Sequence, residues 1–388
     1  MGLLSRRQLP ARGDEMRSIG WVRSVVQNMP HCLKIVEGVL PGALLICFLA
    51  AGLAQSSQHD SAFIEAFGAG QELVKQGRLA EAEVALEKAK DISPEDTQVL
   101  TLLGKVKGRL GEFQASIVLF KRVVELKPKS ADAHLNLAIV FSDAGELSHA
   151  LEETAKALAL DPNLAAAHFN RARILDDLKR EPEAGAEFAK ACRLTPNDAD
   201  CFFYWSFVER AEGNFAKESA LLQRVVKLQP DRSKAFMLLG SSLLEQSRTA
   251  EAVVALRRAL EIDPNSSEAA YMLSRALKTS DPNESRRLKE HFDALRQKNA
   301  AVERSKTLGN EAYGASREQD WPKAVSLYKE ALENCGDCEI QAALHKNLGL
   351  VLCRAGNVQE GGTELRKALE LNPNDPDVVK ALSILGQN

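Results

Sequence analysis

Aromatic residues are scarce in this sequence. They make up 5% of its 388 residues, although hydrophobic residues as a whole reach 45%. Stretches in which β-branched residues alternate with polar ones, the pattern of strands, are also missing. The abundant residues are Ala, Leu, Glu and Lys, which favour helices. The composition therefore predicts an all-α protein.

An excess of one charge sign is lacking too. The chain has 50 basic and 53 acidic residues, which gives a net charge of −3. Basic residues form no long run or stripe, so we do not expect a nucleic-acid partner. The mixed charges are typical of solvated helix faces.

Sequence motifs of catalysis are likewise missing. The chain contains no glycine-rich phosphate loop, no H-E-x-x-H or G-x-S-x-G sequence and no clustered pair of acids. Its seven histidines are scattered. We therefore do not expect an enzyme, and we expect no catalytic residue, cofactor, bound metal or small-molecule substrate.

The first 54 residues differ from the rest. Six basic residues precede an apolar run from Val39 to Ala54, which ends in small residues before Gln55. A basic flank, a short apolar core and a small-residue exit predict a secretory signal peptide. A stable membrane span needs about 20 residues, more than this run offers, and an uncleaved membrane leader is the alternative.

Three methionines are candidates for the true start: Met1, Met16 and Met29. A start at Met29 would give a signal of ordinary length. Residues 1–54 are thus predicted to be a signal peptide or membrane leader, and residues 55–62 a linker. We expect an exported bacterial protein, periplasmic or secreted. If the leader is retained, the protein is anchored in the membrane and faces the periplasm.

Proline recurs at intervals of 34 residues over most of the chain. The residues in phase are Pro94, Pro128, Pro162, Pro196, Pro230 and Pro264, and Pro373 follows after three periods plus seven residues. Such a fixed period is the signature of a repeat protein. Each proline ends one helix and begins the turn to the next unit.

Small residues recur in the same phase. If the proline takes position 32 of each unit, position 8 holds Gly70, Gly104, Ala138, Ala172, Ser206, Gly240 and Ser274. Position 20 is also small in most units, and Glu218 is an exception. Two helices approach closely only where a side chain is nearly absent, so these positions mark the crossing inside a helical hairpin.

This spacing resembles the tetratricopeptide repeat family, whose pattern has small residues at positions 8 and 20 and proline at position 32. The resemblance covers residues 63–388 and implies a solenoid of about nine helical hairpins that coils into a right-handed superhelix. It predicts a regular array over 63–280, an irregular helical connector over 281–304, and a C-terminal pair of repeats with a capping helix over 305–388. We expect a kink or subdomain boundary near 281–305.

The resemblance also implies a binding surface, because first helices line the concave groove in this family. The expected groove residues are large apolar or hydrogen-bonding side chains at positions 5, 6 and 9: Leu135, Asn136, Phe169, Asn170, Arg173, Phe203, Tyr204, Phe207 and Met237. Such residues equally pack neighbouring helices in the family. Phe202 and Trp205, at positions 4 and 7, are expected to face the core.

Lys306, Asn310 and Asn347 resemble part of the carboxylate clamp with which some family members hold the C-terminal tail of heat-shock chaperones. The complete clamp needs a Lys and an Arg in the following helix. Here the matching residues are Asp377 and Ala381, so the clamp is predicted to be incomplete.

Two cysteine pairs are candidate disulfides. Cys335 and Cys338 form a C-x-x-C sequence in a turn, which suits a disulfide, a redox couple or half a zinc site. Cys192 and Cys201 lie in adjoining units, where they form either a staple between repeats or buried free thiols.

The function expected from this sequence is that of a scaffold that binds a protein or peptide partner in its groove outside the cytoplasm. One alternative is an anchored structural component of a cell-envelope assembly that binds through its convex face or its ends. Another is a redox or metal protein that uses Cys335 and Cys338. A membrane contact is expected only if the leader is uncleaved.

Overall fold

The computed structural model describes residues 61–386. Regular structure in this part consists of α-helices without a strand, which confirms the all-α prediction. The predicted leader and the start of the linker, residues 1–60, lie outside the described residues. None of the described helices is both long enough and apolar enough to span a membrane.

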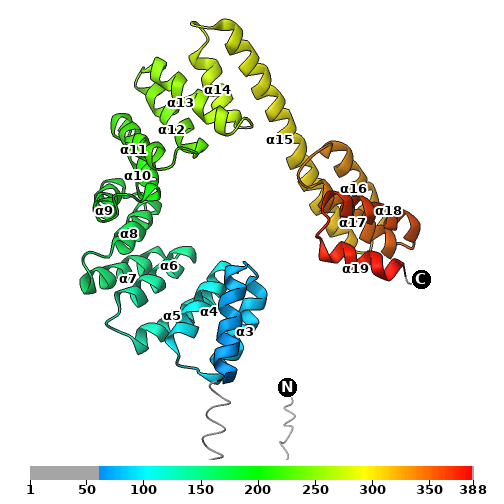
Figure 1. Cartoon of the computed structure of the whole chain (residues 1–388), viewed down its shortest axis with the longest axis horizontal. Helices are drawn as coiled ribbons and strands as arrows, with labels where there is room; N and C mark the ends of the chain where they lie inside the picture. The colour runs from blue at the N-terminus through cyan, green and yellow to red at the C-terminus, as the bar shows by residue number, and fades with distance from the viewer. Residues whose placement is uncertain (1–60, 387–388) are drawn as a thin grey trace, which may run out of the picture. The chain divides into compact units, whose positions relative to one another are not determined.

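The chain divides into two compact units, Met1–Leu160 and Asp161–Asn388. The described helices of the first unit, blue to green in Figure 1, are a helix over residues 61–75, α3 (Leu79–Ile92), α4 (Thr97–Arg109), α5 (Phe113–Leu126), α6 (Ala131–Asp143) and α7 (Leu147–Leu160). They form three hairpins, in agreement with the predicted repeat phase.

The second unit begins with hairpins in the same phase and then departs from it. Its helices are α8 (Ala165–Asp177), α9 (Glu181–Leu194), α10 (Ala199–Ala211), α11 (Phe215–Leu228), α12 (Ser233–Glu245), α13 (Thr249–Ile262), α14 (Ser267–Ala276), α15 (Pro282–Arg317), α16 (Trp321–Cys335), α17 (Gln341–Arg354), α18 (Val358–Leu371) and α19 (Pro376–Leu385).

Local sequence determines where these helices begin and end. Asp96 accepts hydrogen bonds from the backbone N–H groups of Gln98 and Val99 and so caps the first turn of α4. At the far end of that helix, Gly111 has φ of 82°, a left-handed conformation that glycine adopts without strain. Lys179 and Ser247 take the same repeat position with φ of 59°. The turn is therefore retained even where glycine is replaced.

The core of each hairpin lies where its two helices cross. The small residues at position 20, among them Ala82, Ala184 and Ala252, are fully buried. In the second repeat the Ser116 hydroxyl donates a 2.7 Å hydrogen bond to the carbonyl oxygen of Gly104 across the crossing. Small side chains thus bring the two helices close enough for a direct contact with backbone.

The longest helix, α15, covers the region predicted to be irregular. It runs from Pro282 to Arg317 and serves both as the second helix of repeat seven and as the first helix of repeat eight. Near its start, Ser285 donates to the carbonyl oxygen of Ser274 in α14, and further along Ser305 donates to that of Ala331 in α16. One helix therefore contributes to two successive hairpins.

Candidate functional site

An aromatic cluster lies on α8 and α10, the first helices of repeats four and five. The rings of Phe169 and Tyr204 meet edge to face with centroids 5.6 Å apart. Phe203 and Phe207 meet in the same way at 5.0 Å, and Tyr204 and Phe207 lie 6.4 Å apart. The structure thus brings together four predicted groove residues: Phe169, Phe203, Tyr204 and Phe207. We define the aromatic patch as Phe169, Tyr204 and Phe207 together with Arg173, which contacts Tyr204.

Tyr204 is the exposed centre of this patch, with 41% of its surface accessible. The guanidinium of Arg173 lies 5.8 Å from the centroid of its ring, a cation–π contact between neighbouring helices. Asn170 donates its side-chain amide to the carbonyl oxygen of Ala166 in its own helix, at 2.8 Å. Tyrosine and arginine are side chains enriched at the energetic centres of protein interfaces.

Two predicted groove residues are buried, which corrects their placement on the surface. Phe203 is only 5% exposed and packs with Leu222, Val225 and other core residues, while Arg232 covers its ring at 3.6 Å. Leu135 is 7% exposed. Both side chains sit too deep to contact a partner directly, and Phe203 supports the patch from below.

Met237, the last apolar groove residue of the prediction, is half-buried and packs against the cluster of Leu256 and Leu273. This contact makes it part of the wall between repeats six and seven. Met237 stands at position 5 of its repeat, the position of the buried Phe203, whereas the exposed Tyr204 stands at position 6.

The first compact unit has a hollow of its own, of about 400 Å³. It lies along the first helices of three successive repeats and includes the predicted groove residue Asn136. The other lining residues are mainly polar: Phe67, Gln71, Thr97, Gln98, Thr101, Leu102, Lys105, Val123, Lys127, Ser130, Asp132 and Ala133. Sequence reasoning missed Thr101 and Lys105, although they occupy positions 5 and 9.

Phe202 and Trp205, expected in the core, are only half-buried. They line a hollow between α9 and α11. The indole N–H of Trp205 donates a 2.7 Å hydrogen bond to the buried carboxylate of Glu209, and the ammonium of Lys217 lies over its ring. Both side chains also pack against the buried Cys192 and Cys201, so they face the core on one side and the hollow on the other.

The scattered histidines share one contact. In three repeats the Nδ1 atom at position 4 lies 2.5–2.6 Å from a glutamate at position 23: His134–Glu153, His168–Glu187 and His345–Glu364. Nε2 of His168 also lies 3.0 Å from the carbonyl oxygen of Pro162. The ring therefore lies between the carboxylate of Glu187 and the backbone of the turn before α8.

In two of these pairs the pKa of the glutamate is shifted. Burial alone would raise the pKa of Glu187, but hydrogen bonds from His168 and Lys190 outweigh it and hold the pKa below its ordinary value. The same balance, with Lys367 and His345 as donors, lowers the pKa of Glu364. The pairs tie the first helix of a repeat to its second helix, which is a structural role.

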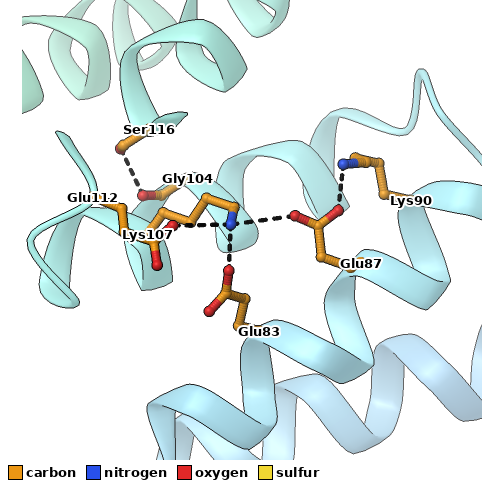
Figure 2. A network of polar contacts seen from close by, with 7 residues as sticks. All are labelled: Glu83, Glu87, Lys90, Gly104, Lys107, Glu112 and Ser116. Atoms are coloured by element: carbon orange, nitrogen blue, oxygen red, sulfur yellow. Dashed lines mark hydrogen bonds and ion pairs between the residues drawn. The ribbon is translucent and has the colours of Figure 1, made fainter. Parts of the chain in front are cut away.

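A shared cation joins the first two repeats. Figure 2 shows Lys107 of α4 between Glu83, Glu87 and Glu112, and its side chain is only 12% exposed. Burial alone would lower the pKa of Lys107, but hydrogen bonds to the three carboxylates raise it above its ordinary value. The ammonium therefore remains charged and neutralises acids from α3 and from the turn after α4.

Both cysteine pairs form disulfides in the structure. Cys192 and Cys201 connect α9 to α10 with Cα atoms 5.6 Å apart, and Cys335 and Cys338 close the turn after α16 at 5.3 Å. Cys353 is free, and burial raises the pKa of its thiol. Over residues 61–386 no group of three or more His, Cys, Asp or Glu side chains is arranged to hold a metal ion.

The clamp-like residues do not form a cationic site. Lys306 pairs with Glu303 at 2.9 Å and with Glu339 at 3.8 Å, in a hollow of about 410 Å³ that also includes Asp337. Asn310 is exposed and Asn347 is half-buried. Because Lys306 is already paired with acidic side chains, it is less available to bind the carboxylate of a ligand.

The described residues thus form a repeat protein of helical hairpins. Tetratricopeptide-repeat sequence models match residues 67–96, 101–165, 141–199, 209–267 and 310–376, more than half of the chain. The chain belongs to the tetratricopeptide repeat family, whose members are typically non-catalytic modules of protein–protein interaction.

Solved structures of the family are similar to parts of the chain. YrrB, described as a TPR protein with an unusual peptide-binding site, has 23% identity and a TM-score of 0.43 over 45% of this chain and 91% of its own. MamA has 22% identity and a TM-score of 0.40 over 44% and 92%. A tetratricopeptide repeat protein from Parabacteroides merdae ATCC 43184 has 15% identity and a TM-score of 0.45 over 75% and 99%. No curated protein sequence matches the chain.

Proposed function

We propose that this chain is a non-enzymatic scaffold that binds a protein or peptide partner on the first helices of its repeats, with the aromatic patch as a principal contact. The observation that carries the proposal is the exposed Tyr204 ring, bracketed by Arg173, Phe169 and Phe207. Aromatic side chains add large contact area for little lost conformational freedom, which is why interfaces favour them.

The patch is also pre-organised. Phe203 is fixed in the core directly below Tyr204, at 6.0 Å between ring centroids, so the exposed ring has a rigid support. A partner that binds a rigid surface loses less conformational entropy on association than one that must order it. The polar hollow of the first compact unit, with Asn136 and Lys105, offers a second place for hydrogen bonds to a peptide backbone.

We further propose that the protein works outside the cytoplasm. Support comes from the basic and apolar character of residues 1–54 and from the two disulfides, since disulfides persist in oxidising compartments. A periplasmic or secreted form follows if the leader is cleaved, and a membrane-anchored form if it is kept. Mass spectrometry of the N-terminus of the native protein distinguishes the two.

An anchored structural component of an envelope assembly is the second candidate. The observation that favours it is a set of exposed valines on second helices, such as Val84, Val118 and Val254, at one repeat position. They stand on second helices, whereas the aromatic patch is on first helices, and they would suit contacts with a larger assembly.

The proposal is tested by crosslinking and pull-down from the native envelope fraction with the full chain and two variants. Tyr204→Ala should lose the captured partner, because it removes the exposed ring. Tyr313→Ala is the matched control, since Tyr313 is an exposed tyrosine of α15 outside the patch. Equal capture by Tyr204→Ala and the unaltered protein, or selective loss with Tyr313→Ala, would place the binding surface elsewhere.

A further inference from the structure

A second surface lies on the other side of α10. A hollow of about 810 Å³ opens between α9 and α11, the second helices of repeats four and five. Its lining is Ala189, Cys192, Arg193, Pro196, Phe202, Trp205, Lys217, Ala220, Leu221 and Arg224. Apolar atoms form the floor, and three cationic side chains are among the lining residues.

The position of the floor residues on α10 separates this hollow from the aromatic patch. Successive residues of an α-helix are rotated by about 100°, so Phe202 and Trp205 project from roughly the opposite side of α10 to Tyr204 and Phe207. A ligand in the hollow therefore leaves the aromatic patch free. The two surfaces can act independently.

Repeat five differs from repeat four at the residues that line the hollow. Repeat four fills position 4 and position 23 with the hydrogen-bonded pair His168 and Glu187. Repeat five has Phe202 and Leu221 at these positions, so no polar pair closes the space between the helices. The Trp205 indole N–H is already bonded to Glu209. Lys217 lies over the ring of Trp205 and Arg224 over that of Phe202, so the apolar floor is bordered by cations.

The charged residues of the hollow indicate the chemistry of that ligand. Lys217 is paired with Glu209 at 2.6 Å. Arg193 donates to the carbonyl oxygen of Ala189 at 3.2 Å, and Arg224 donates to that of Pro196 at 2.9 Å. The Arg224 guanidinium also lies 5.4 Å from the centroid of the Phe202 ring. Among residues 61–386 neither guanidinium has a carboxylate partner, although each could bind one through two parallel hydrogen bonds.

We propose that this hollow binds an acidic peptide segment of a partner protein. An apolar side chain of the segment occupies the floor on Phe202 and Trp205, and carboxylates beside it pair with Arg193 and Arg224. Charge complementarity selects this occupant, because a neutral or basic segment would leave two guanidinium groups unpaired. The site goes beyond the proposed function, since it shares no residue with the aromatic patch.

The test measures binding of two fluorescein-labelled hexapeptides to the full chain by fluorescence anisotropy. One is Glu-Asp-Leu-Phe-Asp-Glu and the other is Lys-Arg-Leu-Phe-Arg-Lys, which keeps the apolar pair and reverses the charge. The acidic peptide should bind saturably, with an affinity that falls as salt is raised, and at least tenfold more tightly than the basic one.

Variants then locate the site. The double variant Arg193→Glu/Arg224→Glu should weaken binding of the acidic peptide by about tenfold or more, because two charge-assisted contacts become repulsive. The matched control is Arg258→Glu in α13, which reverses an exposed arginine at the repeat position of Arg224. Tyr204→Ala should bind the peptide as the unaltered chain does, which separates this site from the aromatic patch. Circular dichroism verifies that each variant is folded.

Three results would overturn the proposal: no saturable binding of the acidic peptide, equal binding of both peptides, or equal binding by the double variant and Arg258→Glu. Sedimentation analysis tests whether a second copy of the protein occupies the hollow instead. A dimer of the unaltered chain that dissociates in the double variant would assign the hollow to a second copy of the protein instead.

Discussion

The backbones of Gly349 in α17 and Gly361 in α18 are in direct contact. A Cβ atom on Gly361 would lie 2.7 Å from the carbonyl oxygen of Gly349, and one on Gly349 would lie 2.9 Å from that of Gly361. These residues occupy positions 8 and 20 of the last repeat. The side chains of Cys353 and Leu365 crowd the same two positions. The carbonyl oxygens belong to the backbone, however, and cannot move aside as a flexible side chain can.

Replacing Gly361 by alanine should therefore destabilise the protein by roughly 1–3 kcal/mol, as overpacking does. Urea unfolding followed by circular dichroism measures the change. Gly314→Ala is the matched control, because nothing lies within 4 Å of a Cβ at that helical position. The control should be stabilised by about 0.5–1 kcal/mol through helix propensity. A neutral Gly361→Ala would contradict the close approach.

The Lys107 cluster makes a second prediction (Figure 2). Lys107→Met keeps much of the side-chain volume and leaves Glu83, Glu87 and Glu112 without their shared cation. We expect a loss of about 1–2 kcal/mol, less than for a fully buried pair because the acids are partly in water. Thermal melts at low salt should show it most clearly.

The control for this cluster is Arg248→Met, which removes an exposed pair with Glu251 on the surface of α13. Surface pairs of this kind contribute little to stability. If the two variants lose the same free energy of unfolding, Lys107 contributes no more to stability than an exposed surface cation.

Much of this architecture is predictable because the same pattern of packing residues recurs in successive repeats. Glycine or alanine at the helix crossing recurs with the proline, so the phase of the hairpins follows from the sequence alone. The long helix α15 is harder to predict. Between Pro282 and Arg317 no residue stops the helix, and repeats seven and eight merge where the small-residue pattern is lost.

The candidate site was predicted less completely than the fold. Position 5 on a first helix can point to solvent or to the next repeat, and neighbouring side chains decide which. Phe203 is buried because Leu222, Val225 and Arg232 surround it. Those partners come from α11 and from the turn before α12, so periodicity along α10 alone cannot reveal them. The hollow beside Phe202 is equally hard to predict, because its lining residues also come from several helices.

Acid should destabilise the protein partly through Glu187. Its folded pKa lies below the unfolded value of about 4.3, so its stabilising effect is complete above that pH. The effect is lost as the pH falls through the folded pKa. Glu187→Gln should therefore lower the free energy of unfolding at pH 7 and weaken its decline below about pH 4.3, measured by urea unfolding across pH.

The pKa of Glu218 is shifted in the opposite direction to that of Glu187. Burial raises its pKa and outweighs the hydrogen bond from Arg210. Its contribution therefore becomes less favourable as the pH rises from about 4.3 through the folded pKa. Glu218→Gln should remove that loss and make the protein relatively more stable at neutral pH. Parallel pH profiles for Glu187→Gln and Glu218→Gln would contradict at least one of the two assignments.

The last prediction separates support from contact within the aromatic cluster. Phe203→Ala removes a buried ring and should reduce the free energy of unfolding by about 3–5 kcal/mol. Tyr204→Ala removes an exposed ring, so we expect a much smaller loss of stability and a partner affinity weaker by about 1–3 kcal/mol. Denaturant unfolding measures the first quantity, and titration with the captured partner measures the second. If Tyr204→Ala unfolds as easily as Phe203→Ala, the ring is part of the core. If it binds the partner normally, the patch is not the contact, and the exposed valines of the second helices become the surface to test.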